Sequence, residues 1–256
     1  IAAPPRHLFV AHLLTHRIHR FSLPDGAELP AFRNGADAEP WRTNARLFGL
    51  GWRDGWLYHG VVDSGEFSST AHTGLAVVYR SRPDGSEMTE VARLDLGYGR
   101  AVDWQRWRNA VSPYARTAIG QAMLSDIDFD RQGNPILGFR DRVTDMLAVL
   151  AVNDARYGAG DVLPTVPEGA GWRVITSPER YQDRTVVDEA LWGGLAAFPG
   201  LDHVVVSALG PVDLSAAGAL WLDNAAGGQF RREALADIAG GTTLSGASGL
   251  GDVESL

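Results

Sequence analysis

Short apolar runs separated by turn sequences dominate the chain and predict β-strands. Runs such as HLFVAHLL (7–14) and GLAVVYRS (74–81) are rich in branched and aromatic residues, which favour strands. Turn sequences such as PDG (24–26) and QGN (132–134) lie between such runs, because glycine and asparagine tolerate the backbone of tight turns. Helical periodicity is scarce, and residues 232–240 are the best candidate for a short helix. The pattern predicts an all-β fold, either an antiparallel sandwich, a barrel or a propeller.

Internal repetition separates these architectures. A unit of successive strands recurs at residues 46–85, 123–153 and 191–233. A fourth unit is split, with a first strand at 249–256 and the following strands at 7–26. A split unit is how a β-propeller closes its ring and removes exposed edge strands. The repeats therefore favour a propeller over a linear array of sheets.

The predicted fold is a small β-propeller with four to five blades, forming one domain over residues 1–256. Its ring would be closed by pairing of the N- and C-terminal strands, with Val253 beside the strand that contains Phe9. Residues 24–46 and 154–188 have weak strand patterns, so we expect them to be long excursions between blades.

The sequence DIDFDRQGNPILGFRDR begins at Asp126 and has two interpretations. An EF-hand calcium loop needs glycine at position 6 and a bidentate glutamate at position 12. Counting from Asp128 places Gly133 at position 6 but Phe139 at position 12, and counting from Asp126 places Arg131 at the glycine position. The pattern favours a β-hairpin over a calcium loop.

Composition excludes several classes of function. The net charge is −8, and all 23 basic residues are arginine, so no basic stripe indicates a nucleic-acid partner. The chain has no cysteine, which excludes disulfides, thiolate metal sites and cysteine nucleophiles. No run approaches the roughly 18 apolar residues of a membrane-spanning helix, so no membrane insertion is expected. Secretion would require a signal peptide that has been removed before residue 1.

Acidic pairs recur at similar points of successive units and are candidate binding residues. They are Asp126 with Asp128, Asp188 with Glu189, and Asp252 with Glu254. If their strands line a central channel, the converging carboxylates would need a cation such as calcium, or arginines, to offset their repulsion. The alternative is that each acid caps a turn or pairs with a neighbouring arginine. The sequence leaves the identity of any metal ligands unknown.

A second candidate is the charged sequence FRDRVTD. Arg140 and Arg142 would share one face of a strand, and Asp141 and Asp145 the other. Such a cluster fits a fork that binds a carbohydrate or a carboxylate. The pattern favours the other interpretation, a salt-bridge network between blades.

Two family resemblances add to these patterns. Residues 10–26 are similar to an NHL-type propeller repeat, with Arg17, Ile18 and Phe21 in place and His12 where an acidic residue is usual. More widely, the chain resembles the propeller-like region that precedes SdrD-type B repeats in large bacterial surface proteins. The segments that carry this resemblance are RTNARLFGLGWRDG, MLSDIDFDRQGNPILGFRDRVTD, DEALWGGLAAFPG, GPVDLSAAGALWLDN and GLGDVESL. The resemblance implies an extracellular or cell-surface module without established chemistry.

Two functions are consistent with these features. The first is a non-enzymatic extracellular module for adhesion or assembly, whose partner is a glycan, a protein or further copies of itself. The second is a propeller hydrolase or lyase with carboxylates that face the channel, and whether it depends on calcium is left open. The chain lacks G-x-S-x-G, H-E-x-x-H and P-loop motifs, which favours the first function.

Overall fold

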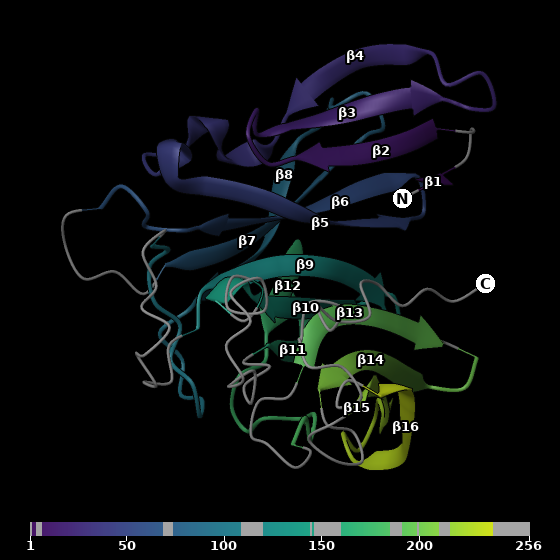
Figure 1. Ribbon diagram of the computed structural model, residues 1–256. Helices are drawn as coiled ribbons and strands as arrows, with labels where there is room; N and C mark the ends of the chain where they lie inside the picture. The colour runs from purple at the N-terminus through teal and green to yellow at the C-terminus, as the bar shows by residue number, and fades with distance from the viewer. Residues whose placement is uncertain are drawn as a thin grey trace.

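The computed structural model describes residues 2–3, 7–68, 74–108, 120–143, 145, 160–184, 191–198, 200–209 and 216–237. These residues form an all-β fold of four antiparallel sheets with four strands each (Figure 1). Two short 3-10 helices, η1 (Gly35–Ala38) and η2 (Arg42–Asn44), follow the first sheet. Within the described ranges, none of the helices is long and apolar enough to cross a membrane.

Each sheet is built from four consecutive strands that pair in chain order. The first sheet contains β1 (Ala2–Ala3), β2 (His7–His12), β3 (Arg17–Ser22) and β4 (Glu28–Arg33). The second contains β5 (Ala45–Arg53), β6 (Trp56–Asp63), β7 (Leu75–Ser81) and β8 (Thr89–Asp95). The third contains β9 (Ala122–Phe129), β10 (Pro135–Asp141), β11 (Asp161–Glu168) and β12 (Gly171–Val174). The fourth contains β13 (Leu191–Phe198), β14 (His203–Leu209), β15 (Ala216–Asp223) and β16 (Gln229–Asp237).

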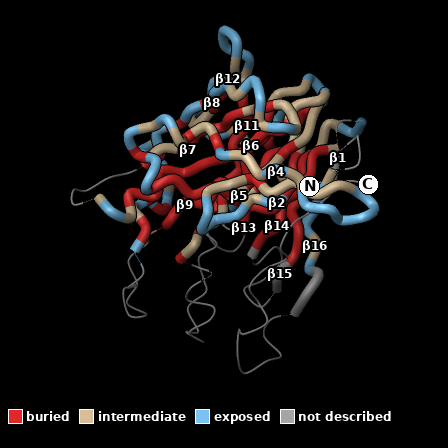
Figure 2. The backbone as a smooth tube through the Cα atoms, turned by 90° about the horizontal axis from the view of Figure 1, so that it is seen from above, coloured by how far each residue is buried: buried red, intermediate tan, exposed pale blue. Residues whose placement is uncertain are grey.

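The sheets pack face to face in the order of the sequence. β5, the first strand of the second sheet, contacts β2 of the first sheet and β9 of the third, and β9 also contacts β13 of the fourth. Three apolar clusters fill the spaces between the first and second, the second and third, and the third and fourth sheets. Figure 2 shows the buried residues along the strands and the exposed residues mainly in the turns. Repeated four-stranded antiparallel sheets of this kind are propeller-like.

The hairpin prediction for the segment that begins at Asp126 is confirmed. β9 pairs with β10 in antiparallel register from Phe129 opposite Pro135. The Asp130 side chain accepts hydrogen bonds from the backbone N–H groups of Gln132 (2.9 Å) and Asn134 (2.7 Å), which closes the turn as aspartate commonly does.

Three predictions about local structure are wrong. The expected excursion at 24–46 contains β4, and the one at 154–188 contains β11 and β12, which complete the third sheet. β10 therefore pairs with β11, and not with a strand at 146–153, which lies outside the described residues. The expected helix at 232–240 is instead part of β16 as far as residue 237, because pairing with β15 outweighs the local helical preference.

The predicted ring closure concerns residues that the structure does not describe. The first sheet draws all four of its described strands from residues 2–33, with β1 paired to β2. The four described sheets are separate, and none closes on itself. Residues 238–256 lie outside the described ranges, so the pairing of Val253 with the Phe9 strand stays a prediction.

Candidate functional site

Two predicted binding residues, Asp126 and Asp128, join the third sheet to the fourth. Oδ2 of Asp126 accepts a hydrogen bond from the backbone N–H of Leu195, and Oδ2 of Asp128 accepts one from Ala197, both at 2.7 Å. The other oxygen of each carboxylate accepts the N–H of the following residue. Leu195 and Ala197 belong to the edge strand β13, whose outward N–H groups need acceptors when buried. These contacts give both aspartates a structural role.

Arg140 extends the same join. Its guanidinium group makes a two-pronged ion pair with Asp145, at 2.7 and 2.6 Å, and donates through Nη1 to the carbonyl oxygen of Trp192 in β13 at 3.0 Å. The strand ends at Asp141, so the expectation that Asp141 and Asp145 share one strand face is wrong. Asp145 instead lies against Arg140, because the chain leaves the strand before it.

Asp141 and Arg142 hold the segment around Gln121. Oδ1 of Asp141 accepts hydrogen bonds from the backbone N–H groups of Gln121 and Val143, at 2.8 and 2.9 Å. Arg142 donates to Oε1 of Gln121 at 2.7 Å and lies over the Trp107 ring. Burial lowers the pKa of the Arg142 guanidinium from its ordinary value. The described contacts of these residues organise the fold, and a ligand at this cluster stays a prediction.

The remaining predicted residues, Asp188, Glu189, Asp252 and Glu254, lie outside the described residues.

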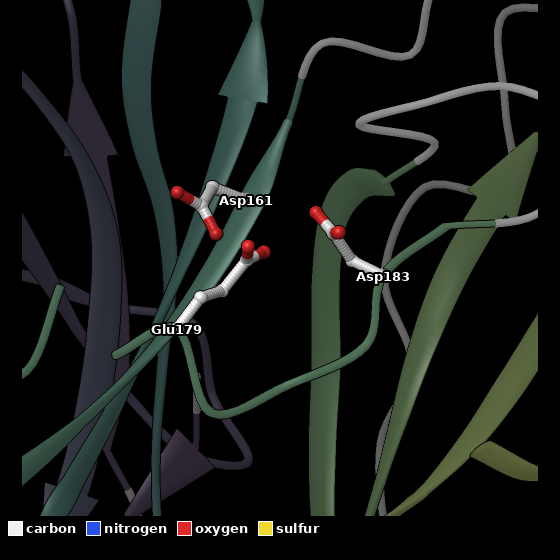
Figure 3. Close-up of side chains that lie close together, drawn as sticks. All are labelled: Asp161, Glu179 and Asp183. Atoms are coloured by element: carbon white, nitrogen blue, oxygen red, sulfur yellow. The ribbon is translucent and has the colours of Figure 1, made fainter. Parts of the chain in front are cut away.

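An acidic cluster that the sequence did not predict lies at the start of β11. Asp161 is the first residue of that strand, and Glu179 and Asp183 come from the segment that follows β12. One carboxylate oxygen from each residue lies within 4.8 Å of the others. Figure 3 shows the three side chains directed toward a shared space. Asp161 and Asp183 are buried, with 4% and 3% of their surface exposed, whereas Glu179 is exposed.

The segment after β8 fixes the position of Asp161. The Tyr98 hydroxyl donates to Oδ2 of Asp161 at 2.5 Å and accepts a hydrogen bond from Nε1 of Trp104 at 3.1 Å. Nε of Arg100 lies 4.0 Å from the same Asp161 oxygen, and its guanidinium stacks on the Trp104 ring at 3.7 Å. Burial, followed by the charge of Asp161, raises the pKa of Tyr98 well above its ordinary value. Tyr98 therefore stays protonated and keeps donating to the carboxylate.

A pocket of about 520 Å³ adjoins this cluster. Its lining includes the carboxylates Glu179 and Asp183, the guanidinium groups of Arg184 and Arg232, and the amides of Gln182 and Gln229. The residues of this lining carry both hydrogen-bond donors and acceptors. Such a lining suits a ligand with many hydroxyl groups better than an apolar one.

The wall of the pocket is anchored to the fourth sheet. The Tyr181 hydroxyl donates to Oδ1 of Asn224, and the N–H of Gln182 donates to the carbonyl oxygen of Gly227 at 2.9 Å. Gln229 donates to the carbonyl oxygens of Gln182 and Arg184. Burial raises the pKa of Tyr181 above its ordinary value. The pocket thus lies between the segment that follows β12 and strand β16 of the fourth sheet.

The acidic cluster has the donor set that a hard cation prefers. Calcium takes oxygen ligands, mainly carboxylates and carbonyls, and Asp161, Glu179 and Asp183 could together hold a metal ion. Sequence reasoning missed these residues because they lie in the segment expected to be an excursion. The one available signal was Glu179 and Asp183 flanking Tyr181 in the sequence PERYQD.

Comparisons with known proteins place few limits on the function. No family model matches the chain. Colossin-C of Dictyostelium discoideum is 32% identical over 109 residues, which cover 38% of this chain and 10% of that protein. The chain therefore spans about a tenth of the length of this curated relative.

Similar solved structures cover most of the chain at low identity. They include a putative 6-phosphogluconolactonase from Bacteroides uniformis (12% identity, 90% of this chain, 54% of that chain, TM-score 0.43). A Hadza microbial sialidase (10%, 86%, 40%, 0.46) and an endo-arabinase from Bacteroides thetaiotaomicron (14%, 90%, 76%, 0.41) are also similar. With TM-scores below 0.5, these likenesses assign no activity to this chain.

Proposed function

We propose that this protein is a non-enzymatic, extracellular or cell-surface module that binds a glycan in the pocket beside Asp183. The proposal rests on one observation, the pocket of about 520 Å³ that presents carboxylates, guanidinium groups and amides to one space. Sugars offer many hydroxyl groups, each both a donor and an acceptor, so they can satisfy such a mixed lining. Localisation at the cell surface comes from the resemblance to bacterial surface proteins alone.

A calcium ion at the acidic cluster is part of the proposal. Three carboxylates within 4.8 Å repel one another, and a bound cation would offset this repulsion beside the glycan. Asp161, Glu179 and Asp183 would supply the oxygen ligands, with Tyr98 holding Asp161 in place.

The experiment compares glycan binding by the wild type, Asp183→Asn and a matched control. Asp54→Asn removes the same charge from a hairpin turn where the side chain is 84% exposed. On a glycan array with calcium present, the wild type and Asp54→Asn should bind the same glycans, and Asp183→Asn should lose them. Binding that survives in Asp183→Asn would overturn the proposed site, and binding of a protein but no glycan would replace the proposed partner.

Calcium is tested separately through thermal melting. The melting temperature of the wild type should rise with calcium and fall in chelator, because a ligand that binds only the folded state stabilises it. Asp183→Asn should show neither change. An unchanged wild-type melting temperature would remove calcium from the proposal and leave the glycan pocket standing.

A closed propeller ring belongs to the same proposal. Residues 249–256 would pair with the edge of β2 beyond β1, whose described register covers only His7 and Leu8. Deleting residues 249–256 should then lower the melting temperature and promote self-association. A deletion variant that melts like the wild type and stays monomeric in light scattering would argue against closure.

A second function, glycoside hydrolysis, is favoured by the three carboxylates that cluster beside the pocket. Glycosidases use a pair of carboxyl groups that flank the scissile bond. Release of reducing sugar from a bound polysaccharide by the wild type, lost in Asp183→Asn but not in Asp54→Asn, would replace the binding function with hydrolysis.

A further inference from the structure

Two arginines of the second sheet share one tryptophan. Trp56 is the first residue of β6, and Arg80 and Arg82 lie at and just beyond the end of β7. The register pairs Tyr58 with Arg80 and Leu57 with Ser81, so Trp56 lies on the same face as both arginines. The guanidinium carbons of Arg80 and Arg82 are 4.6 and 3.7 Å from the centre of the Trp56 ring.

The two arginines differ in their partners. Nε of Arg82 donates to Oε1 of Glu87 at 3.0 Å. Arg80 is half-buried, its side chain makes no hydrogen bond or ion pair within the part of the chain that the structure describes, and its Nε is buried without an acceptor. Two guanidinium groups thus sit on one indole with one carboxylate between them. A half-buried arginine without an anion is costly, because its donors lose water without gaining an acceptor.

The surroundings hold these groups in place. Tyr58, opposite Arg80, packs edge-on against Phe129 at 4.7 Å and against Trp172 at 6.1 Å. Arg53 lies over the Phe129 ring at 5.5 Å, forms an ion pair with Asp54, whose side chain is 84% exposed, and donates to the carbonyl oxygen of Asp130 at 3.4 Å. The second and third sheets therefore meet here in an aromatic floor with an excess of positive charge, in a protein whose net charge is −8.

We propose that Arg80 and Arg82, stacked on Trp56, form a binding site for an oxyanion group such as a phosphate, sulfate or carboxylate. Stacking on an aromatic ring leaves the N–H edge of a guanidinium free, and that edge matches two oxygens of an oxyanion. The two Nη groups of Arg80, whose Nε is buried, supply donors that have no acceptor among the described residues, and Arg82 adds a second positive charge. The site lies on the second sheet and is independent of the glycan pocket, which is lined by the segment after β12 and by β16.

The test is an NMR titration that follows the indole N–H resonance of Trp56, assigned by its absence in Trp56→Phe. Inorganic phosphate is added at constant ionic strength, with sodium sulfate and sodium acetate as parallel arms. The Trp56 resonance should shift and saturate. A higher affinity for phosphate and sulfate than for acetate would identify a tetrahedral ligand, and the reverse a carboxylate.

Variants separate this site from general charge effects. Arg80→Gln should weaken binding about tenfold, as expected for the loss of charge-assisted hydrogen bonds. Arg93→Gln, which removes the same charge from β8 where Glu39 and Glu90 already pair with the arginine, should bind as the wild type does. If Arg80→Gln fails to fold, Arg82→Gln should weaken binding severalfold instead. The proposal is overturned if no oxyanion gives a saturable shift, or if the folded variants of Arg80 or Arg82 bind as tightly as Arg93→Gln.

Discussion

The third sheet packs against a neighbouring sheet on each side, and these two joins use different interactions. Toward the second sheet, β9 packs against β5 through glycine. A Cβ atom at Gly51 would lie 2.6 Å from the carbonyl oxygen of Ile127, and one at Gly49 would lie 2.9 Å from that of Leu124. Toward the fourth sheet, β9 meets β13 through the carboxylates of Asp126 and Asp128. The first join depends on the close approach of two backbones, and the second depends on hydrogen bonds.

This difference shows how one edge strand, β9, can pack against two neighbouring strands, β5 and β13, that have different requirements. The backbones of β5 and β9 approach so closely that no side chain fits between them, so only glycine is tolerated. β13 presents N–H groups at its unpaired edge, and an acceptor must replace the strand that is missing there. The aspartates of β9 supply it. Acidic residues on a first strand can therefore mark a join between sheets and need not mark a ligand.

The join between the first and second sheets contains a buried histidine. We expect this residue to have the largest effect on the free energy of unfolding. His59 is fully buried, stacks on Tyr79 at 5.9 Å, and within the described residues neither ring nitrogen has a hydrogen-bond partner. Burial lowers the pKa of His59 from 6.5 to about 3. The folded state therefore keeps His59 neutral, whereas the unfolded chain takes up a proton as the pH falls below about 6.5.

Stability should decrease as the pH falls from 6.5 toward 3, by up to roughly 5 kcal/mol from this residue alone. The free energy of unfolding, measured in urea across this range, should show a shallower slope in His59→Leu than in the wild type. His59→Leu should also be at least as stable at pH 7, because it buries no unpartnered nitrogen. Equal slopes in the two proteins would refute the assignment.

Substitution in the glycine join between β5 and β9 should cause the next largest loss of stability. Gly51→Val would force a side chain against the Ile127 carbonyl, and we expect a loss of about 3 kcal/mol from overpacking. Urea denaturation measures the loss. Gly99→Ala is the control, because a Cβ there meets nothing within 4 Å. A Gly51→Val protein as stable as Gly99→Ala would mean that β5 and β9 do not approach as described.

The stability of the carboxylate join between β9 and β13 should depend on the hydrogen-bond acceptor of Asp126 more than on the size of its side chain. Asp126→Ala leaves the N–H of Leu195 without its acceptor, which should cost about 2 kcal/mol in unfolding free energy. Asp126→Asn keeps an acceptor oxygen and should cost less. If both substitutions cost the same in urea denaturation, the acceptor oxygen and the volume that asparagine keeps do not support the join, and the charge of the carboxylate does.

Substitution of Ser125 should cause the smallest loss of stability. Its hydroxyl donates to the carbonyl oxygen of Gly193 in β13 at 3.0 Å, so Ser125→Ala should lose about 1 kcal/mol, the usual net value of one hydrogen bond. Thermal melting is sufficient to detect this change. A gain in stability would show that the contact is not formed in solution.

The sequence predicted the second sheet, the first three strands of the fourth sheet and the β9–β10 hairpin because these strands alternate with turns of recognisable chemistry. The β5–β6 turn illustrates this, since Asp54 and Gly55 both have positive φ, as a two-residue hairpin requires. β11 was missed because Pro164 and Pro167 oppose strand formation. Both prolines are tolerated because β11 pairs with β10 through residues 161–164 and with β12 through residues 165–168.

The candidate site could not be predicted for a related reason. Asp161, Glu179 and Asp183 come together only through the pairing of β11 and the anchoring of the following segment to the fourth sheet. Neither is visible as a local pattern. Asp126 and Asp128 were found from their spacing, but that spacing does not reveal whether their oxygens meet a ligand or the backbone of the next sheet.

Hydrogen exchange at two amides tests the central claim about β9 most directly. The N–H of Leu195 should lose protection in Asp126→Ala, and that of Ala197 in Asp128→Ala, while the other measured amides of β13 change much less. Protection of both amides that is unchanged in the folded variants would contradict the claim, and would return the two aspartates to the list of candidate ligand-binding residues.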